Sequence, residues 1–183
     1  MKTLTVKQPF AYLIFNGKDI ENRTWPTKHR GRVLIHASAK RCNFNEIFTD
    51  EQWIETGENN RVECILFTSP VSAIIGSVEI VDCVVNHPSV WAEKRDGRLN
   101  SAKQWIEKPI YNWVLANPIL FPEPIPAKGK LSLWDYPNIL AEPEEKDGEL
   151  FCHCQLSVDE KYQVTGSAHF GHHCRYCGGR WYK

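Results

Sequence analysis

Apolar and polar positions along the chain follow a pattern that predicts a sheet built from widely separated strands. Residues 31–38, 72–85 and 111–121 are rich in β-branched and aromatic side chains, which suit the half-buried surface of a sheet. Shorter apolar runs at 3–6 and 132–136 predict two further strands near the ends of this region. The connections between these strands are too long for simple hairpins.

Two of the connections have the spacing of helices. Residues 8–17 carry apolar side chains at i, i+3 and i+4, and Gly17 supplies the left-handed residue that ends many helices. Residues 45–56 predict a second, amphipathic helix. Helices and proline-containing turns such as residues 121–130 favour an α+β fold with a curved, barrel-like sheet over a doubly wound one.

The charge of the chain is balanced overall but unevenly distributed. Residues 1–40 contain eight Lys and Arg against two acidic residues, although the whole chain has a formal net charge of zero. A basic region on an otherwise acidic protein can attract phosphate-bearing ligands, and it can equally be a solvated face. The charge alone leaves both interpretations open.

Several classes of protein are disfavoured by what the sequence lacks. There is no run of about 18 apolar residues and no apolar stretch typical of a signal peptide at the first residues, so we expect a cytoplasmic protein without a membrane partner. There is no phosphate-binding loop and no dinucleotide fingerprint. A Ser/His/Asp or paired-carboxylate motif is also absent, which argues against an enzyme of those classes.

The segment "GKDIENRTW" at residues 17–25 places three charged side chains close together. Lys18 falls in a turn after the first helix, and alternation along an extended chain puts Glu21, Arg23 and Trp25 on one face. One interpretation is a half-exposed ion pair worth about 0–1 kcal/mol. The other is the rim of a ligand pocket with cationic donors, a carboxylate acceptor and an aromatic stacking plane, as a nucleobase and its phosphate would require.

Four other residues are weaker candidates for the same site. His36 lies in an apolar strand, where a hydrogen-bonded core histidine is the commoner role. Ser38 and Lys40 extend that strand and could contact either phosphate or solvent. Trp113 is a second candidate for ligand stacking, although most of the seven tryptophans must belong to the core.

The last part of the chain differs from the rest in composition. Residues 1–140 form the predicted main domain, the acidic stretch 141–150 reads as a linker, and 151–183 form a small module. This module contains C-x-C and C-x-x-C motifs, a spacing that favours a structural zinc ion over disulfides when no secretory signal is present. The predicted zinc ligands are Cys152, Cys154, Cys174 and Cys177, with His153, His169, His172 and His173 as alternatives.

The stretch "LTVKQPFAYLIFNGKDIENRTW…RGRVLIHASAK" resembles the ASCH (activating-signal-cointegrator homology) family. The similarity continues through "IIGSVEIVDCV", "HPSVWAE", "YNWVLANP" and "PIPAKGKLSLWDY", and covers residues 2–137. The family signature is G-x-K-x-x-E-x-R. This chain matches it at Lys18, Glu21 and Arg23, but has Asn16 at the glycine position and Gly17 one place later, so we expect a turn shifted by one residue.

The resemblance implies a small PUA-like β-barrel with flanking helices. It also implies a cleft lined by Lys18, Glu21 and Arg23 that binds RNA or a nucleotide-like ligand. Some members act as hydrolases, including amidohydrolases in which the signature lysine is a base and a threonine nucleophile stands at the position of Glu21. Thr24 is the nearest threonine here, and alternation turns it to the opposite face. That mechanism is therefore not carried over.

Three functional hypotheses follow from the sequence. The leading one is an RNA- or nucleotide-binding domain with a zinc-containing extension. The second is a hydrolase acting on a modified nucleoside or on RNA, with Lys18 and Glu21 as candidate catalytic residues. The third is an adaptor that binds a protein partner through the zinc module.

Overall fold

A computed structural model describes residues 1–43, 48–56 and 68–137 of the 183-residue chain. Within 48–56, the side chain of Trp53 is not described. Further along the chain, the description covers the backbone of six short strands only. They are β9 (Glu144–Lys146), β10 (Glu149–Cys152), β11 (Tyr162–Gln163), β12 (Thr165–Ser167), β13 (Gly171–His173) and β14 (Arg180–Trp181).

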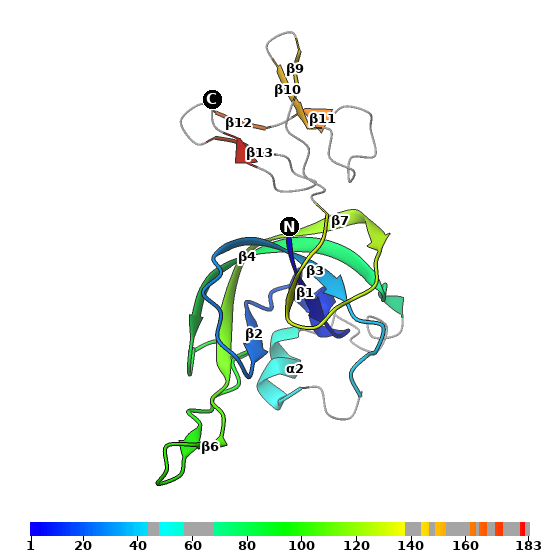
Figure 1. The fold of residues 1–183 in the computed structure, drawn as a ribbon. Helices are drawn as coiled ribbons and strands as arrows, with labels where there is room; N and C mark the ends of the chain where they lie inside the picture. Colours follow the sequence, from blue (N-terminus) through cyan, green and yellow to red (C-terminus); the bar gives the residue numbers. More distant parts are fainter. Residues whose placement is uncertain are drawn as a thin grey trace.

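A six-stranded mixed sheet dominates the described part of the chain (Figure 1). Its strand order is β2-β7-β4-β3-β1-β8, in which β1 and β3 are parallel and the other neighbours are antiparallel. The strands are β1 (Lys2–Val6), β2 (Ile20–Arg23), β3 (Gly31–Ala37), β4 (Ala73–Val84), β7 (Tyr111–Pro126) and β8 (Leu133–Asp135). The strands predicted from the apolar pattern are all present.

The sheet curls until strands far apart in its order meet. β2 and β1 are separated by three strands in the sheet, yet Nη2 of Arg23 in β2 donates to the backbone carbonyl of Thr5 in β1 over 2.8 Å. Figure 1 shows the same curvature, with the long strands β4 and β7 bending around β1 and β3. The expected barrel-like sheet is therefore confirmed as a curled, half-closed barrel.

Side chains from the inner face of the sheet fill the barrel. Leu4 of β1, Val33 and Ile35 of β3, and Val78 and Ile80 of β4 belong to one buried cluster with almost no exposed surface. Alternate residues of each strand contribute to this cluster, as the period of a strand requires. A second, smaller cluster joins Leu13, Ile20 and Trp91 outside the barrel core.

Two helices whose bounds the structure describes flank the sheet. α1 (Phe10–Leu13) follows β1 within the predicted helix, but it ends earlier than expected and turns continue to Gly17. α2 (Asp50–Thr56) occupies the second half of the predicted helix 45–56, and residues 44–47 lie outside the described residues. At its start, Oγ1 of Thr49 accepts from the amide of Gln52, and Oε1 of Gln52 accepts from the amide of Thr49, both over 3.3 Å. This reciprocal capping box explains why the helix begins there.

β7 is longer than predicted, because it includes residues expected to form a proline-rich turn. The strand extends to Pro126, while its register against β4 shifts between the pairs Gly76–Leu120 and Ile74–Ile125. Proline has no amide hydrogen for the ladder and is tolerated in strands where pairing is interrupted. The irregularity therefore lets the prolines remain within an extended strand.

A small hairpin, made by β5 (Arg98–Leu99) and β6 (Trp105–Glu107), projects from the barrel between β4 and β7 (Figure 1). No helix in the described part of the chain is long and apolar enough to span a membrane. The domain boundaries predicted at 140 and 150 remain predictions.

Candidate functional site

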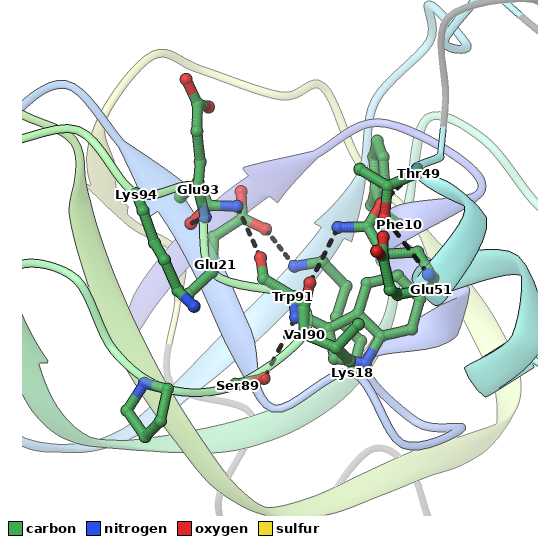
Figure 2. Close-up of a pocket in the computed structure, with 14 residues that line it drawn as sticks. Phe10, Lys18, Glu21, Thr49, Glu51, Ser89, Val90, Trp91, Glu93 and Lys94 are labelled. Atoms are coloured by element: carbon green, nitrogen blue, oxygen red, sulfur yellow. Dashed lines mark hydrogen bonds and ion pairs between the residues drawn. The ribbon is translucent and has the colours of Figure 1, made fainter.

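A pocket with a volume of about 870 Å³ opens beside the edge strand β2. Its walls come from α1, from the residues leading into β2, from the start of α2 and from the loop 88–94 that follows β4. Figure 2 shows side chains from these segments converging on one space. The volume falls within the range of about 300–1,000 Å³ that is usual for small-molecule sites.

Lys18 forms part of the pocket wall because the end of α1 directs the chain there. Gly17 has a φ angle of +99°, and the amide of Lys18 donates to the carbonyl of Leu13 over 2.9 Å, as in a Schellman cap. The Lys18 side chain is only 3% exposed. Its Nζ donates to the carbonyl of Ile20 and, over 2.8 Å, to Oε2 of Glu21. The ammonium group is thus held inside the protein.

Both carboxylate oxygens of Glu21 are engaged by cations. Oε2 lies 2.8 Å from Nζ of Lys18, and Oε1 lies 2.9 Å from Nη2 of Arg23. Burial raises the pKa of the Glu21 carboxyl group, but the charges and hydrogen bonds of Lys18 and Arg23 outweigh burial and leave the pKa below its usual value. Glu21 is therefore ionised at neutral pH, and two cationic side chains share one carboxylate.

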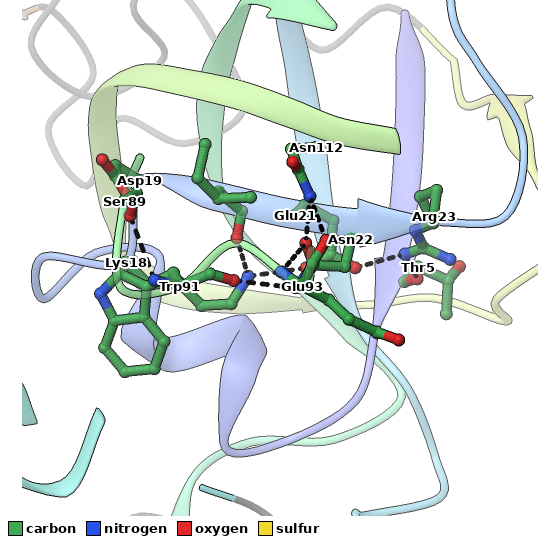
Figure 3. A network of polar contacts seen from close by, with 11 residues as sticks. Thr5, Lys18, Asp19, Glu21, Asn22, Arg23, Ser89, Trp91, Glu93 and Asn112 are labelled. Atoms are coloured by element: carbon green, nitrogen blue, oxygen red, sulfur yellow. Dashed lines mark hydrogen bonds and ion pairs between the residues drawn. The ribbon is translucent and has the colours of Figure 1, made fainter. Parts of the chain in front are cut away.

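Arg23 belongs to this cluster of paired charges, Lys18–Glu21–Arg23, but does not line the pocket. Its Nη2 bridges Oε1 of Glu21 and the carbonyl of Thr5, while its Nε is buried without a hydrogen-bond partner. Figure 3 shows Arg23 on the side of Glu21 that faces Thr5, away from Lys18. Arg23 therefore positions the Glu21 carboxylate from outside the pocket.

Two asparagines on neighbouring strands attach the loop that forms one pocket wall (Figure 3). Asn112 of β7 donates from Nδ2 to Oδ1 of its register partner Asn22 over 2.9 Å. Asn22 donates to the carbonyl of Trp91 over 2.8 Å and accepts from the amide of Glu93 over 3.0 Å. Asn112 also accepts from the amide of His87 over 2.9 Å. The loop is held through its backbone, so its course depends on these two side-chain amides.

The same loop has a second attachment at Ser89. Oγ of Ser89 donates to Oδ1 of Asp19 over 2.5 Å and accepts from the amide of Trp91 over 3.1 Å. The Trp91 side chain is 3% exposed and packs with Leu13 and Ile20. Asp19 and Ile20 directly follow Lys18 in the sequence. The segment that carries Lys18 therefore also holds the loop that forms the opposite wall of the pocket.

Two donor groups of the pocket residues have hydrogen-bonding capacity that no described residue uses. An ammonium group has three N–H donors, and only the carbonyl of Ile20 and the carboxylate of Glu21 accept from Lys18. The Phe10 ring centroid lies 5.7 Å from the same Nζ. The indole Nε1 of Trp91 is buried and has no hydrogen-bond partner among the residues that the structure describes. A ligand that presents acceptor atoms next to a flat ring would complement these groups.

The rim of the pocket carries both signs of charge. Glu51, Glu93 and Lys94 line it and are exposed. Glu93 is paired with Arg95 at 3.0 Å. The rim is therefore not a concentrated phosphate site.

The structure places the remaining predicted site residues outside the pocket. Trp25 packs edge-on against Trp113, with 4.5 Å between ring centroids, and the Nε1 of Trp113 donates to the carbonyl of Trp25. Trp113 has 0% exposure, so the interpretation that a ligand stacks on it is wrong. Thr24 is exposed and does not line the pocket.

The predicted candidates of β3 lie in the core or beyond the end of the strand. His36 is 1% exposed, its Nε2 lies 3.0 Å from the carbonyl of Ala127, and its ring packs edge-on against Trp134. This agrees with the core interpretation of His36. Ser38 accepts from the amide of Lys40 over 3.2 Å, and neither residue lines the pocket.

The basic excess of residues 1–40 is mostly neutralised by acidic side chains. Lys18 and Arg23 share Glu21, and acidic residues of β4 and β8 pair with other cations at 2.8–2.9 Å. The additional pairs are Lys2–Asp135, Arg30–Asp82 and Arg32–Glu79. The excess seen in the sequence is therefore not a continuous basic face.

Sequence reasoning missed the residues that build the outer wall of the pocket, namely Asn22, Ser89, Trp91, Glu93 and Asn112. The block "HPSVWAE" contained part of the signal, because it lies between two strong strands and carries a tryptophan flanked by turn residues. The paired asparagines gave no signal, since their contact joins residues 90 positions apart. Three of the predicted zinc ligands, Cys154, Cys174 and Cys177, and the side chain of Cys152 lie outside the described residues.

Comparison with known proteins identifies the family of the chain. The family model described as "ASCH domain" matches residues 4–125, which run from within β1 to most of β7 and include the whole pocket. Over 84 residues the chain is 34% identical to Activating signal cointegrator 1 of Homo sapiens and 33% identical to Activating signal cointegrator 1 of Mus musculus. Each match covers 44% of this chain but only 14% of the relative's length. The family match extends over more than half of the 183 residues, and the chain belongs to the ASCH domain family.

Proposed function

We propose that the chain binds RNA or a nucleotide-like ligand, with a nucleobase held in the pocket beside β2. The observation that carries the proposal is the buried Lys18 ammonium, fixed by Glu21 and still able to donate one hydrogen bond at the pocket wall. Membership of the ASCH family supports this class of ligand, since these domains are proposed to bind RNA.

The chemistry of the pocket favours a base over a phosphate group. Lys18 has one spare donor, and nucleobases present carbonyl oxygens and ring nitrogens as acceptors. The Phe10 ring adds an aromatic surface in the same pocket. Glu51 at the rim would repel a phosphate placed beside it, whereas Glu93 is paired with Arg95 and the neighbouring Lys94 is exposed. The sugar and phosphate of the ligand would therefore lie on the Lys94 side of the rim.

Glu21 and Arg23 act indirectly in this proposal. Glu21 balances the Lys18 charge and fixes the position of Nζ, while Arg23 holds the Glu21 carboxylate from the side of Thr5. The pair thus prepares a cationic donor before any ligand arrives. Such preorganisation reduces the cost of binding, because the side chain has no freedom left to lose.

Binding is favoured over hydrolysis by the state of Glu21. Its two oxygens already contact Lys18 and Arg23, and its lowered pKa makes the carboxylate a weak base. The hydrolase hypothesis, with Lys18 and Glu21 as catalytic residues, is tested in the experiment described below. The adaptor hypothesis concerns the predicted zinc module and stays a prediction from sequence.

The test is a titration of wild-type protein and Lys18→Met with the common ribonucleoside monophosphates, together with an assay of both proteins for turnover of an acylated nucleoside and of a short RNA. Lys18→Met retains the volume of the side chain and removes the donor. We expect it to weaken binding by about 1.5–3 kcal/mol, the usual value of a hydrogen bond to a charged group. The control is Lys28→Met, because Lys28 is exposed and outside the pocket. Equal affinities for all three proteins would refute the proposal, and turnover lost in Lys18→Met would support the hydrolase hypothesis instead.

A further inference from the structure

The hairpin β5–β6 exposes apolar surface that the barrel does not use. Trp105 is 50% exposed, Ile106 61% and Leu99 47%. A two-stranded hairpin gains little stability by itself, and large apolar side chains in water add none. We call residues 95–108 the arm.

The arm also carries cations that lack acidic partners. Arg98, Lys103 and Lys108 are exposed, and no ion pair among the described residues involves them. Glu107 contacts Arg95 at 3.5 Å, whereas Asp96 accepts only from the neutral amide of Asn86 and keeps its charge, so three unpaired cations stand against one carboxylate among the described residues. The free charge of the arm is therefore positive, unlike that of the pocket rim.

The base of the arm is fixed to the pocket wall. Arg95 contacts Glu93 at 3.0 Å as well as Glu107, and Glu93 lines the pocket. The amide of Ile110 donates to the carbonyl of Arg95 over 3.0 Å and closes the neck of the arm. A ligand that leaves the pocket past Glu93 and Lys94 therefore reaches the arm next.

The arm holds a defined shape up to its tip. Oδ1 of Asn100 accepts from the amides of Ala102 and Gln104 over 3.0 and 2.9 Å, which fixes the turn. Gly97 has a φ angle of +79°, and an added Cβ there would lie 2.8 Å from Cζ3 of Trp105. Trp105 thus packs one edge of its indole against the backbone while half of its surface stays open.

We propose that the arm binds a single-stranded RNA segment next to the nucleotide held in the pocket. An open indole offers a stacking surface for an unpaired base, and the unpaired cations around it match the phosphates of the same strand. A duplex fits less well, because its bases are already stacked and its edges face the grooves. The inference rests on the proposed function for the adjacent nucleotide, but the arm is tested by its own residues.

The experiment compares a single-stranded RNA oligonucleotide, its duplex form and a mononucleotide by fluorescence anisotropy and titration. Trp105→Ala should weaken binding of the single strand about tenfold, as expected for the loss of one stacked base, and leave the mononucleotide unchanged. Trp105→Phe, which keeps a stacking surface, should restore most of the affinity. The control Leu131→Ala removes an exposed apolar side chain (94% exposed) away from the arm and should have no effect.

Charge is tested by the triple variant Arg98→Gln, Lys103→Gln, Lys108→Gln. For single strands the salt dependence of log K falls by about 0.7 for each lost phosphate contact, so we expect a slope reduced by about two. If neither this variant nor Trp105→Ala changes oligonucleotide binding, the inference is wrong, and the arm is left as a surface for a protein. A wild-type protein that binds the oligonucleotide no more tightly than the mononucleotide would also overturn it.

The two proposals fail separately. If Lys18→Met does not alter mononucleotide binding while Trp105→Ala still weakens the oligonucleotide, the pocket proposal fails and the arm proposal stands. If Lys18→Met weakens the mononucleotide while the arm variants bind the oligonucleotide like wild type, the reverse holds.

Discussion

Nζ of Lys18 lies 2.8 Å from Oε2 of Glu21, with both side chains at most 10% exposed. Such a pair is costly to bury, and breaking it leaves a charge without a partner. Here the carboxylate also contacts Arg23 at 2.9 Å, so one anion serves two cations. The stability of the barrel edge and the position of the proposed binding donor therefore depend on the same carboxylate.

We predict that Glu21→Gln destabilises the protein by about 3 kcal/mol or more at neutral pH, because Lys18 and Arg23 lose their shared anion. The folded-state pKa of Glu21 is lowered, so its contribution is fully present above the unfolded-state pKa and is lost as pH falls through the folded-state value. The stability difference between variant and wild type should thus narrow below about pH 4, near the usual pKa of glutamate.

Chemical denaturation at several pH values measures this difference. Glu123→Gln is the control, since Glu123 is exposed and is not part of the Lys18–Glu21–Arg23 cluster. A Glu21→Gln variant as stable as this control at pH 7 would contradict a structural role for the pair.

The asparagine pair yields a prediction about the pocket wall. Asn112→Ala should free the amide of His87 and leave Asn22 without one of its partners, so the loop 88–94 should open more often. Hydrogen exchange at the amide of Glu93 should be faster, and nucleotide binding weaker, because that amide is held by Asn22. Asn43→Ala provides the control, as Asn43 is exposed and does not line the pocket. Unchanged hydrogen exchange at the backbone amide of Glu93 would show that the loop does not need the side-chain amide of Asn112.

Gly76 permits a close approach between the turn that follows α1 and the sheet. An added Cβ would lie 2.4 Å from Cζ of Phe15 and 2.5 Å from the backbone oxygen of Ile119. The Phe15 ring can move, but the backbone oxygen cannot without disturbing β7. We predict that Gly76→Ala costs about 1–3 kcal/mol, the range for overpacked sites, and that adding Phe15→Leu recovers only part of it. If the double variant recovered the full wild-type stability in thermal melts, the clash would be with Phe15 alone.

A further prediction concerns the four cysteines near the end of the chain. We expect about one zinc ion per chain, held by Cys152, Cys154, Cys174 and Cys177, with the free energy of about 10–16 kcal/mol typical of zinc-finger peptides. Chelation should unfold the segment after about residue 145 and leave the barrel melt unchanged. Elemental analysis of reduced protein checks the metal content, with Cys42→Ser as control and Cys174→Ser as the variant expected to lose zinc. Metal-free wild-type protein would contradict the prediction.

Much of the fold could be predicted because its signals are local. β-branched and aromatic runs identified β3, β4 and β7, and Gly17 marked the end of the turns that follow α1. Alternation also placed Glu21 and Arg23 on one face, which the ion pair confirms. Local patterns failed where the register shift in β7 kept prolines inside a strand.

The site was predicted less completely, because its geometry depends on long-range contacts. The signature residues Lys18 and Glu21 lie at the pocket, but Arg23 turns toward Thr5, which the curl of the sheet brings near. Trp25 and Trp113 pack on each other, although the sequence could not distinguish a core pair from a stacking platform. The outer wall required knowledge that Asn22 and Asn112 are register partners.

The most direct measurement is the location of a bound nucleotide by NMR. With backbone amides assigned, a ribonucleoside monophosphate should shift the signals of residues 18–22 and 89–94, and these shifts should vanish in Lys18→Met while those of the control Lys28→Met persist. Such a result is predicted if the Lys18 ammonium donates to the base in the pocket. Shifts confined to another face of the barrel, or shifts in the pocket that are unchanged in Lys18→Met, would contradict it.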